Sequence, residues 1–349
     1  MKNVKIAALV IALGIALVAN AEISVLTTYS LADGGVGSGR IYGLAVEGET
    51  AYVALSLNNL PQIVRIDNLN GVQTRTQLMS PADWVAASGG TGFTPFYGPS
   101  IYGGYLYFGD TSSDVIWQLD KTTPGNLVLY ADKQSITNVT GFGNCSLLAP
   151  HQSDPNTGWF YFYEATSDGI MAATGMNAVI EVATSADLTA ISGNTTCSGL
   201  TVDDESSVYW GSNTSDTMYK RTVTGSYHVV LSTSDITSVT GGGNAGFNTM
   251  FQGKDGKVYF YETTVDSILR FDPSNPAASL EIFLSEADLN TSTAATDSVG
   301  TMAWYGDATG GGPAWHALLA DKDVYTCPIP EPGLLLGGLG VALVLLRRN

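Results

Sequence analysis

The sequence predicts an all-β protein built from a repeated unit of about 50 residues. In the clearest copy, residues 256–288, turn residues separate three short runs rich in aromatic and β-branched residues, Lys257–Tyr261, Ser267–Phe271 and Ser279–Leu284. A period of this length is typical of propeller blades and solenoid arrays. The composition agrees, because 40 glycines and only 13% charged residues favour many turns and few charged helix faces.

Each unit closes with a strand and a Ser-x-Ala-Asp-like motif, such as Ser80–Asp83. A Gly- and Thr-rich loop, an inner strand and a hairpin of two further strands follow. The predicted hairpin strands are 51–55 with 62–66, 105–109 with 115–119, 160–164 with 169–173, 208–212 with 217–221, 258–262 with 267–271, and 314–318 with 324–327. Their alternating aromatic residues are expected to pack between blades, and no helix is predicted among them.

Ring closure distinguishes the two architectures. The N-terminal strand Ile23–Tyr29 precedes any complete unit, and the last unit, residues 300–327, has only three strands. We expect the N-terminal strand to complete the last blade, because closure removes open sheet edges. The predicted fold is therefore a six-bladed β-propeller over residues 22–327, between an N-terminal segment 1–21 and a C-terminal tail 328–349.

Two stretches carry a resemblance to a known repeat. Residues 199–209, which begin Gly-Leu-Thr-Val-Asp, and residues 43–52, which begin Gly-Leu-Ala-Val, resemble repeats of the NHL and related six-bladed propeller families. The resemblance implies an architecture and not an activity, because one propeller fold serves many functions.

The N-terminal segment has the three parts of a secretory signal peptide. Lys2 and Lys5 supply the positive charge, Ile6–Val18 is the apolar region, and Ala19-Asn20-Ala21 is a small-x-small cleavage site. The alternative is an N-terminal membrane anchor, for which the apolar run is short.

The tail contains Pro330-Glu331-Pro332, the apolar run Gly333–Leu346, and Arg347-Arg348 before the last residue. These three parts, in this order, resemble the PEP-CTERM sorting signal of Gram-negative bacteria. The resemblance implies a transient inner-membrane anchor, processing by an exosortase-like enzyme, and a final place at the cell surface or outside the cell. A GPI signal is the rival interpretation, and the terminal arginines count against it.

The charge of the predicted propeller excludes one class of partner. Without the four basic residues and one acidic residue of the two ends, 11 basic and 31 acidic residues remain, a net charge of about −20. Such a surface repels nucleic acid and anionic lipid, so no nucleic-acid partner is expected. It suits a neutral or cationic partner, and solubility alone explains it equally well.

Cysteine placement suggests one bridge. Cys145 and Cys197 occupy matching places in successive units, so a disulfide between neighbouring blades is a candidate in an exported protein. Cys327, beside the tail, is left over.

Acidic residues recur in the hairpin between the second and third strands. The pairs are Asp110 with Asp114, Glu164 with Asp168, and Glu262 with Asp266, while Ser212 and Asp216 take these places in one unit. Two carboxylates across a tight turn are candidate ligands for Ca²⁺, which prefers six to eight oxygen atoms. The alternative is that Asp stabilises each turn through its own backbone contacts.

A Gly-Asn motif recurs before the inner strands, and its asparagines are Asn144, Asn194 and Asn244. Their amides are candidate sugar ligands at the mouth of the central channel, although the turns require Gly and Asn in any case. His151 follows an inner strand, whereas His228 and His316 belong to other blades, so a shared metal site is not expected. No GxSxG, HExxH, P-loop or dinucleotide fingerprint occurs.

The sequence leaves two functions open. The first is an exported surface or matrix protein without enzymatic activity, in which one propeller face binds exopolysaccharide or a surface protein; the PEP-CTERM resemblance implies this setting. The second is a propeller hydrolase, lactonase or lyase that uses a metal held by carboxylates and His151 at the channel mouth. No catalytic set is evident in the sequence, and the substrate is not indicated.

Overall fold

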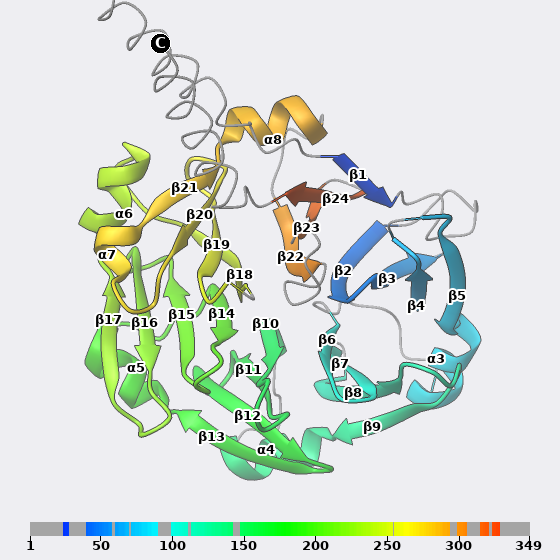
Figure 1. Ribbon diagram of the computed structural model, residues 1–349. Helices are drawn as coiled ribbons and strands as arrows, with labels where there is room; N and C mark the ends of the chain where they lie inside the picture. Colours follow the sequence, from blue (N-terminus) through cyan, green and yellow to red (C-terminus); the bar gives the residue numbers. More distant parts are fainter. Residues whose placement is uncertain are drawn as a thin grey trace, which may run out of the picture.

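The computed structural model describes residues 24–27, 40–57, 60–69, 71–89, 99–110, 113–141, 147–253, 255–293, 299–305, 315–320 and 323–328. Within these ranges the strands form six four-stranded antiparallel sheets that stand around a common axis (Figure 1). The predicted all-β propeller architecture is therefore confirmed.

Five sheets consist of four consecutive strands each. They are β2 (Arg40–Glu47), β3 (Thr50–Leu57), β4 (Leu60–Asp67) and β5 (Thr74–Met79); β6 (Ser100–Tyr102), β7 (Tyr105–Asp110), β8 (Val115–Asp120) and β9 (Leu127–Ala131); β10 (Leu147–Ser153), β11 (Phe160–Glu164), β12 (Gly169–Gly175) and β13 (Ala178–Ala183); β14 (Gly199–Val202), β15 (Val208–Ser212), β16 (Thr217–Arg221) and β17 (Tyr227–Leu231); and β18 (Phe247–Gln252), β19 (Val258–Glu262), β20 (Ser267–Phe271) and β21 (Glu281–Leu284). Each first strand contacts the first strand of the next sheet.

The sixth sheet joins the two ends of the described chain. It contains β22 (Val299–Tyr305), β23 (Trp315–Ala320) and β24 (Asp323–Pro328), with β1 (Ser24–Thr27) antiparallel to β24. This is the pairing predicted for the N-terminal strand. Because β22 contacts both β18 and β2, the sheet also completes the ring of first strands.

The hydrophobic core lies in layers between neighbouring sheets. Side chains alternate along β11, so Phe160 and Phe162 pack toward the sheet β6–β9, whereas Tyr161 and Tyr163 pack toward the sheet β14–β17. The aromatic residues of the second strands are therefore interblade core, as the sequence predicted. Each sheet thus depends on both neighbours for the burial of its two faces.

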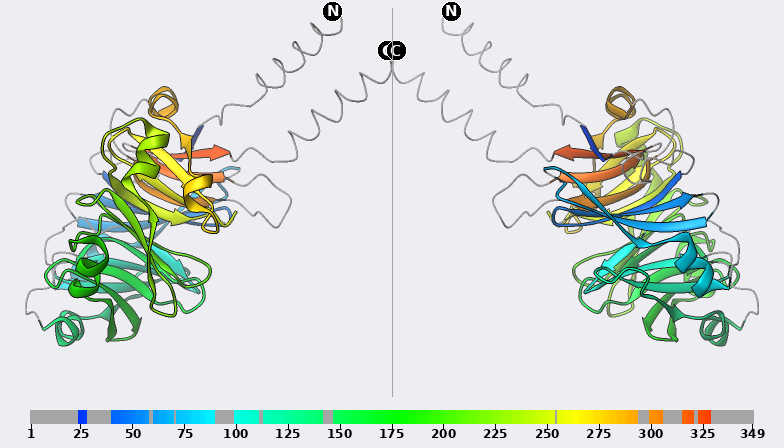
Figure 2. Two further views of the ribbon diagram at one scale, coloured as in Figure 1. Left: turned by 90° about the vertical axis from the view of Figure 1, so that its left-hand side faces the viewer. Right: turned by 90° about the vertical axis from the view of Figure 1, so that its right-hand side faces the viewer.

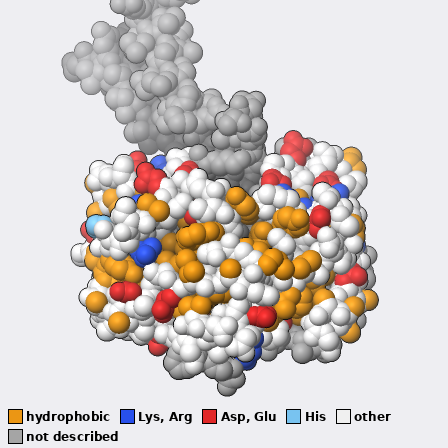
Figure 3. Space-filling model, turned by 90° about the horizontal axis from the view of Figure 1, so that it is seen from below, with side chains coloured by type: hydrophobic (Ala, Val, Ile, Leu, Met, Phe, Trp, Pro, Cys, Tyr) orange, Lys and Arg blue, Asp and Glu red, His pale blue; other side chains and the backbone are white. Residues whose placement is uncertain are grey.

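The outer strands are edges, and each has a feature that disfavours pairing with another chain. A register shift interrupts the pairing of β5, β9, β13, β17 and β21 with their neighbours, and such bulges twist an edge away from a flat template. Four of these strands nevertheless expose aliphatic side chains: Val128, Ile180, Val229 and Ile282. Figure 3 shows a band of hydrophobic side chains on the face seen from below.

The prediction that no helix occurs was wrong. Eight-residue helices follow the fourth strands: α3 (Pro81–Ser88), α4 (Lys133–Thr140), α5 (Ser185–Ser192), α6 (Thr233–Thr240) and α8 (Glu286–Thr293). A shorter helix, α7 (Pro276–Ser279), precedes β21. The Ser-x-Ala-Asp-like motifs mark the starts of the interblade helices and are not loops.

Capping explains why such short segments are helical. In α5 the Thr184 hydroxyl accepts a hydrogen bond from the Asp187 amide at 3.0 Å, and the Asp187 carboxylate accepts one from the Thr184 amide at 2.9 Å. Gly193 ends the helix in the left-handed region with φ 73°. A capping box of this kind contributes about 1 kcal/mol, which matters for a helix too short to form alone.

Each interblade helix connects two sheets. α3 contacts β9, α4 contacts β13, α5 contacts β17, α6 contacts β21, and α8 contacts β1. The helix that follows one outer strand therefore packs on the outer strand of the next sheet. Figures 1 and 2 show these helices at the periphery of the ring.

Both predicted sorting segments lie outside the described residues. The signal peptide and the Pro-Glu-Pro tail, with Arg347 and Arg348, therefore stay predictions. Among the helices of the described ranges, none has the length and apolar character needed to cross a bilayer.

Candidate functional site

The hairpins between second and third strands hold the predicted carboxylate pairs. Successive hairpins of an antiparallel sheet lie alternately at the two ends of its strands. These turns therefore lie at the same end of the strands as the interblade helices. Glu164 is buried, and its carboxylate accepts hydrogen bonds from the amides of Thr166 at 2.9 Å and Ser167 at 2.6 Å. Glu262 does the same for Thr264 at 3.1 Å and Val265 at 2.9 Å. The first acid of each of these pairs therefore caps its own hairpin.

The second acid of each pair serves a different purpose. Asp114, Asp168, Asp216 and Asp266 all have positive φ angles, from 46° to 55°, a conformation that Asp tolerates better than most residues. Their carboxylates point to other partners: Asp168 accepts from the Tyr163 hydroxyl at 2.9 Å, and Asp266 accepts from the Tyr261 hydroxyl at 2.6 Å.

Asp114 pairs with the Lys133 ammonium at 2.8 Å, and Asp110 accepts a hydrogen bond from the Ser113 hydroxyl. The four acids Asp110, Asp114, Glu164 and Asp168 thus have partners that the fold itself supplies. In the described part of the chain, no three His, Cys, Asp or Glu residues cluster as a metal site. Calcium at these hairpins remains a prediction, and the observed contacts are those of turn stabilisation.

The three predicted asparagines have different environments. Asn194 is fully engaged: its Oδ1 accepts from the Thr196 hydroxyl at 2.7 Å and the Ser212 hydroxyl at 2.9 Å, and its Nδ2 donates to the Ser192 carbonyl at 3.1 Å. Asn244 is exposed, and Asn144 lies outside the described residues. The glycines of the same motif end the interblade helices, which is why they require positive φ.

The histidines lie in three different sheets. His151 is in the first strand β10 opposite Phe162, and His316 is in β23 opposite Trp304. His228 is exposed in the outer strand β17. His151 is the histidine that the fold places on an inner strand.

Cys197 is buried and has no disulfide partner among the described residues, and its Sγ lies 3.8 Å from the Gly199 carbonyl oxygen. Burial raises the pKa of this thiol well above its usual range, so it is a poor nucleophile. Cys145 lies outside the described residues, and the bridge between the two stays a prediction.

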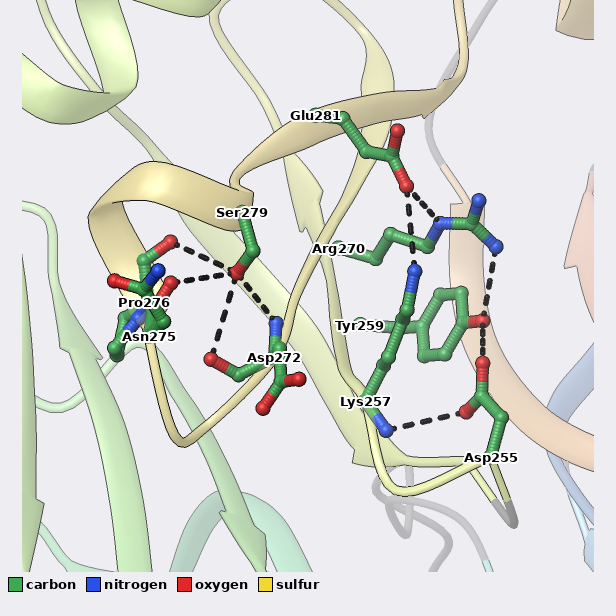
Figure 4. Close-up of polar contacts among 9 residues, drawn as sticks. All are labelled: Asp255, Lys257, Tyr259, Arg270, Asp272, Asn275, Pro276, Ser279 and Glu281. Atoms are coloured by element: carbon green, nitrogen blue, oxygen red, sulfur yellow. Dashed lines mark hydrogen bonds and ion pairs between the residues drawn. The ribbon is translucent and has the colours of Figure 1, made fainter.

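The sequence analysis did not predict the polar clusters around the second-strand tyrosines. These clusters lie at the other end of the strands, away from the interblade helices. In the sheet β18–β21, the Tyr259 hydroxyl donates to the Asp255 carboxylate at 2.8 Å and accepts from Arg270 Nη1 at 3.4 Å. Arg270 Nε also binds Glu281 at 2.7 Å (Figure 4). The sequence signal was a tyrosine in the second strand followed 11 residues later by a long polar side chain in the third.

Burial between the sheets affects the second-strand tyrosines and also Tyr130 of the fourth strand β9. It raises the pKa of Tyr52, Tyr130 and Tyr161 to about 12, because the phenolate loses hydration between the sheets. The nearby Asp154 carboxylate adds to the effect at Tyr161. Tyrosines of this kind are structural donors at neutral pH and not general bases.

Comparison with known proteins was informative only at the level of solved structures. No protein-family model and no curated sequence matches the chain. The fold is similar to virginiamycin B lyase from Staphylococcus aureus, with TM-score 0.51, 15% identity, and coverage of 89% of this chain and 90% of that one. It is also similar to a gluconolactonase from Xanthomonas campestris, with TM-score 0.55, 10% identity, and coverage of 89% and 91%.

A third similar structure is regucalcin, a calcium-binding protein from Agrobacterium tumefaciens, with TM-score 0.53, 11% identity, and coverage of 83% and 93%. Likenesses at such low identity carry the architecture and not the activity. The chain therefore has the β-propeller fold that these lyase, lactonase and calcium-binding structures share.

Proposed function

We propose that the protein is a propeller enzyme of the hydrolase, lactonase or lyase class, with its site near the axis of the ring. The observation that carries this proposal is the likeness to a propeller lyase and a gluconolactonase over about nine-tenths of each chain. Ca²⁺ is the candidate cofactor, a choice supported by the calcium-binding protein among the similar structures.

His151 is the candidate general base or metal ligand of this site. It lies on β10, and the first strands contact one another around the ring axis. An imidazole changes charge near neutral pH, so it suits proton transfer in lactone hydrolysis or in an elimination. The hairpin carboxylates are less suited, because Glu164 and Glu262 already accept backbone hydrogen bonds.

The test uses the chain from residue 22 to residue 328, assayed with glucono-δ-lactone and virginiamycin B, with added CaCl₂ or with EDTA. We expect turnover of one probe, and loss of about 100-fold or more in kcat/KM for His151→Ala. His228→Ala, on an exposed outer strand, is the matched control and should keep full activity. Absence of turnover of both probes, or equal activity of the two variants, would contradict the proposal.

A non-enzymatic binding module is the second candidate. It is favoured by the net charge of −17 of the whole chain and by the Pro-Glu-Pro tail in its sequence. In this case the propeller would bind exopolysaccharide or a surface protein without changing it. Retention on an exopolysaccharide column, together with no turnover of either probe, would support this function over the first.

We further propose that the protein is exported and sorted through its tail. Replacing Glu331 by Ala should leave signal-peptide cleavage intact but block release, because an exosortase-like enzyme would no longer recognise the Pro-Glu-Pro motif. Full-length protein should then accumulate in the inner membrane, held by the run Gly333–Leu346. Mass spectrometry of the released wild-type protein should find a C-terminus before Gly333. An intact Asn349 on released protein would overturn this scheme.

A further inference from the structure

Five sheets share a tyrosine in the second strand with a defined cross-strand neighbour in the third. The pairs are Tyr52 with Arg65, Tyr107 with Gln118, Tyr161 with Ala172, Tyr209 with Lys220, and Tyr259 with Arg270. Four of the neighbours are long polar or cationic side chains. The sheet β10–β13 departs from this pattern, because Ala172 stands where the others place a hydrogen-bond donor.

The sheet β14–β17 shows which side chain occupies the place that Ala172 has in the sheet β10–β13. The Asp203 carboxylate uses Oδ1 to accept the amides of Glu205 at 2.9 Å and Ser207 at 2.8 Å in its own hairpin. Its Oδ2 accepts from the Lys220 ammonium at 3.1 Å, which lies 4.8 Å from the centre of the Tyr209 ring. A carboxylate and an aromatic face thus hold one primary ammonium group.

Asp154 is the counterpart of Asp203 in the sheet β10–β13. Its Oδ1 likewise accepts hairpin amides, from Asn156 at 2.7 Å and Thr157 at 3.3 Å, and the Ser206 hydroxyl at 3.2 Å. Its Oδ2 is buried and has no hydrogen-bond partner among the described residues, and the whole residue is 0% exposed. A buried carboxylate oxygen without a donor is costly, and the donor that is missing is the one that Ala172 cannot supply.

Aromatic rings complete the surroundings of this position. Tyr161 is the cross-strand neighbour of Ala172, and the Trp159 ring lies 6.4 Å from the Tyr161 ring. Arg221 of the next sheet is an alternative source of positive charge. Its charge acts on Tyr161, where it opposes the rise in pKa, and its guanidinium lies 5.9 Å from the centre of the Tyr227 ring. Among the described residues it makes no ion pair with Asp154, and its buried Nε has no hydrogen-bond partner there.

We propose that Asp154, Tyr161 and Trp159 form a binding site for a small primary ammonium ion beside Ala172, where the other four sheets have a long polar or cationic side chain. An ammonium group fits better than a metal ion, because the described residues include no cluster of three metal-ligating side chains here. Aromatic faces also attract organic cations. The Lys220 ammonium in the neighbouring sheet is the built-in example of the occupant. The proposal is independent of the enzymatic function proposed above.

The first test compares methylammonium chloride with sodium chloride and tetramethylammonium chloride at equal ionic strength. We expect methylammonium to raise the Tm of the wild-type protein by about 2 °C beyond either control salt. Tetramethylammonium has no N–H to donate to Asp154 Oδ2 and should give no specific rise. Equal Tm values in all three salts would overturn the proposal.

Variants locate the effect. Asp154→Asn should abolish the methylammonium response, and Ala172→Lys should abolish it while raising the Tm in sodium chloride. Lys220→Ala, the matched variant in the neighbouring sheet, should lower the Tm and increase the response, because it opens a second site. A response that survives Asp154→Asn would overturn the proposal. A response that is absent from the wild-type protein but appears in Arg221→Met would also overturn it, because Arg221 would then supply the charge at this position.

Discussion

A protein without residues 24–27 is expected to lose about 4 kcal/mol of stability, because about four residues lose their pairing and packing. Strand β1 covers the open edge of β24 and also contacts α8. Without it, the sheet β22–β24 keeps three strands and exposes an edge that favours aggregation. The Tm should fall by roughly 10 °C.

Calorimetry and light scattering of the two proteins measure this effect. A protein that lacks only residues 22–23, which precede β1, is the control and should melt like the parent. A synthetic peptide of residues 22–29, added in excess, should restore much of the lost Tm by refilling the edge. If the deletion variant melts at the parental temperature, β1 does not close the ring.

Alkaline titration is expected to unfold the protein between about pH 10 and pH 12. Tyr52, Tyr130 and Tyr161 have pKa values raised to about 12 from 10.0. Because these folded-state values lie above the unfolded one, the protonated form stabilises the fold fully below pH 10. That stability is lost as the pH rises toward 12, where the unfolded chain releases protons that the folded chain retains.

The expected magnitude is large. A rise in pKa from 10 to about 12 corresponds to roughly 3 kcal/mol per tyrosine once the pH exceeds 12, so three such groups approach the whole stability of a typical domain. Absorbance at 295 nm and circular dichroism should therefore change in one cooperative step. Tyr161→Phe should move the midpoint to higher pH, whereas Tyr105→Phe, at an exposed position, should not. A gradual tyrosinate signal with unchanged circular dichroism would contradict this prediction.

The hairpins were predictable because both of their signals are local. The run Phe160–Glu164 has four consecutive aromatic residues, and the turn residue Asp168 tolerates positive φ, so strand bounds and turn followed from sequence. The closing role of the N-terminal strand followed from counting strands. These are properties of short segments and of the chain as a whole, and neither requires knowledge of individual contacts.

The helices were missed because eight residues give no reliable period. In α5 only Leu188 is buried, so the segment has no apolar stripe of the kind that identifies a longer helix. Its signals were Thr184 with Asp187 at the start and Gly193 at the end, which are equally common in turns. The contact with β17 that also holds this helix is not visible in sequence.

The proposed ammonium site could not be predicted from the sequence for a different reason. Asp154 and Asp203 look alike in sequence, since each follows an inner strand and begins a polar hairpin. They differ through Ala172 and Lys220, which become their neighbours only when the third strand pairs with the second. A partner set by cross-strand register must be read from the folded sheet.

The helices that reach forward to the next outer strand determine how such a chain can gain or lose a blade. If a duplicated segment began at the first strand of a sheet and ended at its fourth strand, one interblade helix would have no outer strand to pack against. A segment cut in the loop after each helix, as between Gly193 and β14, carries its own helix and presents an outer strand to the helix before it. A duplication of that segment would add a blade without exposing a helix or an outer strand. The unit that can be duplicated at least cost therefore runs from loop to loop and is offset from the four-stranded sheet.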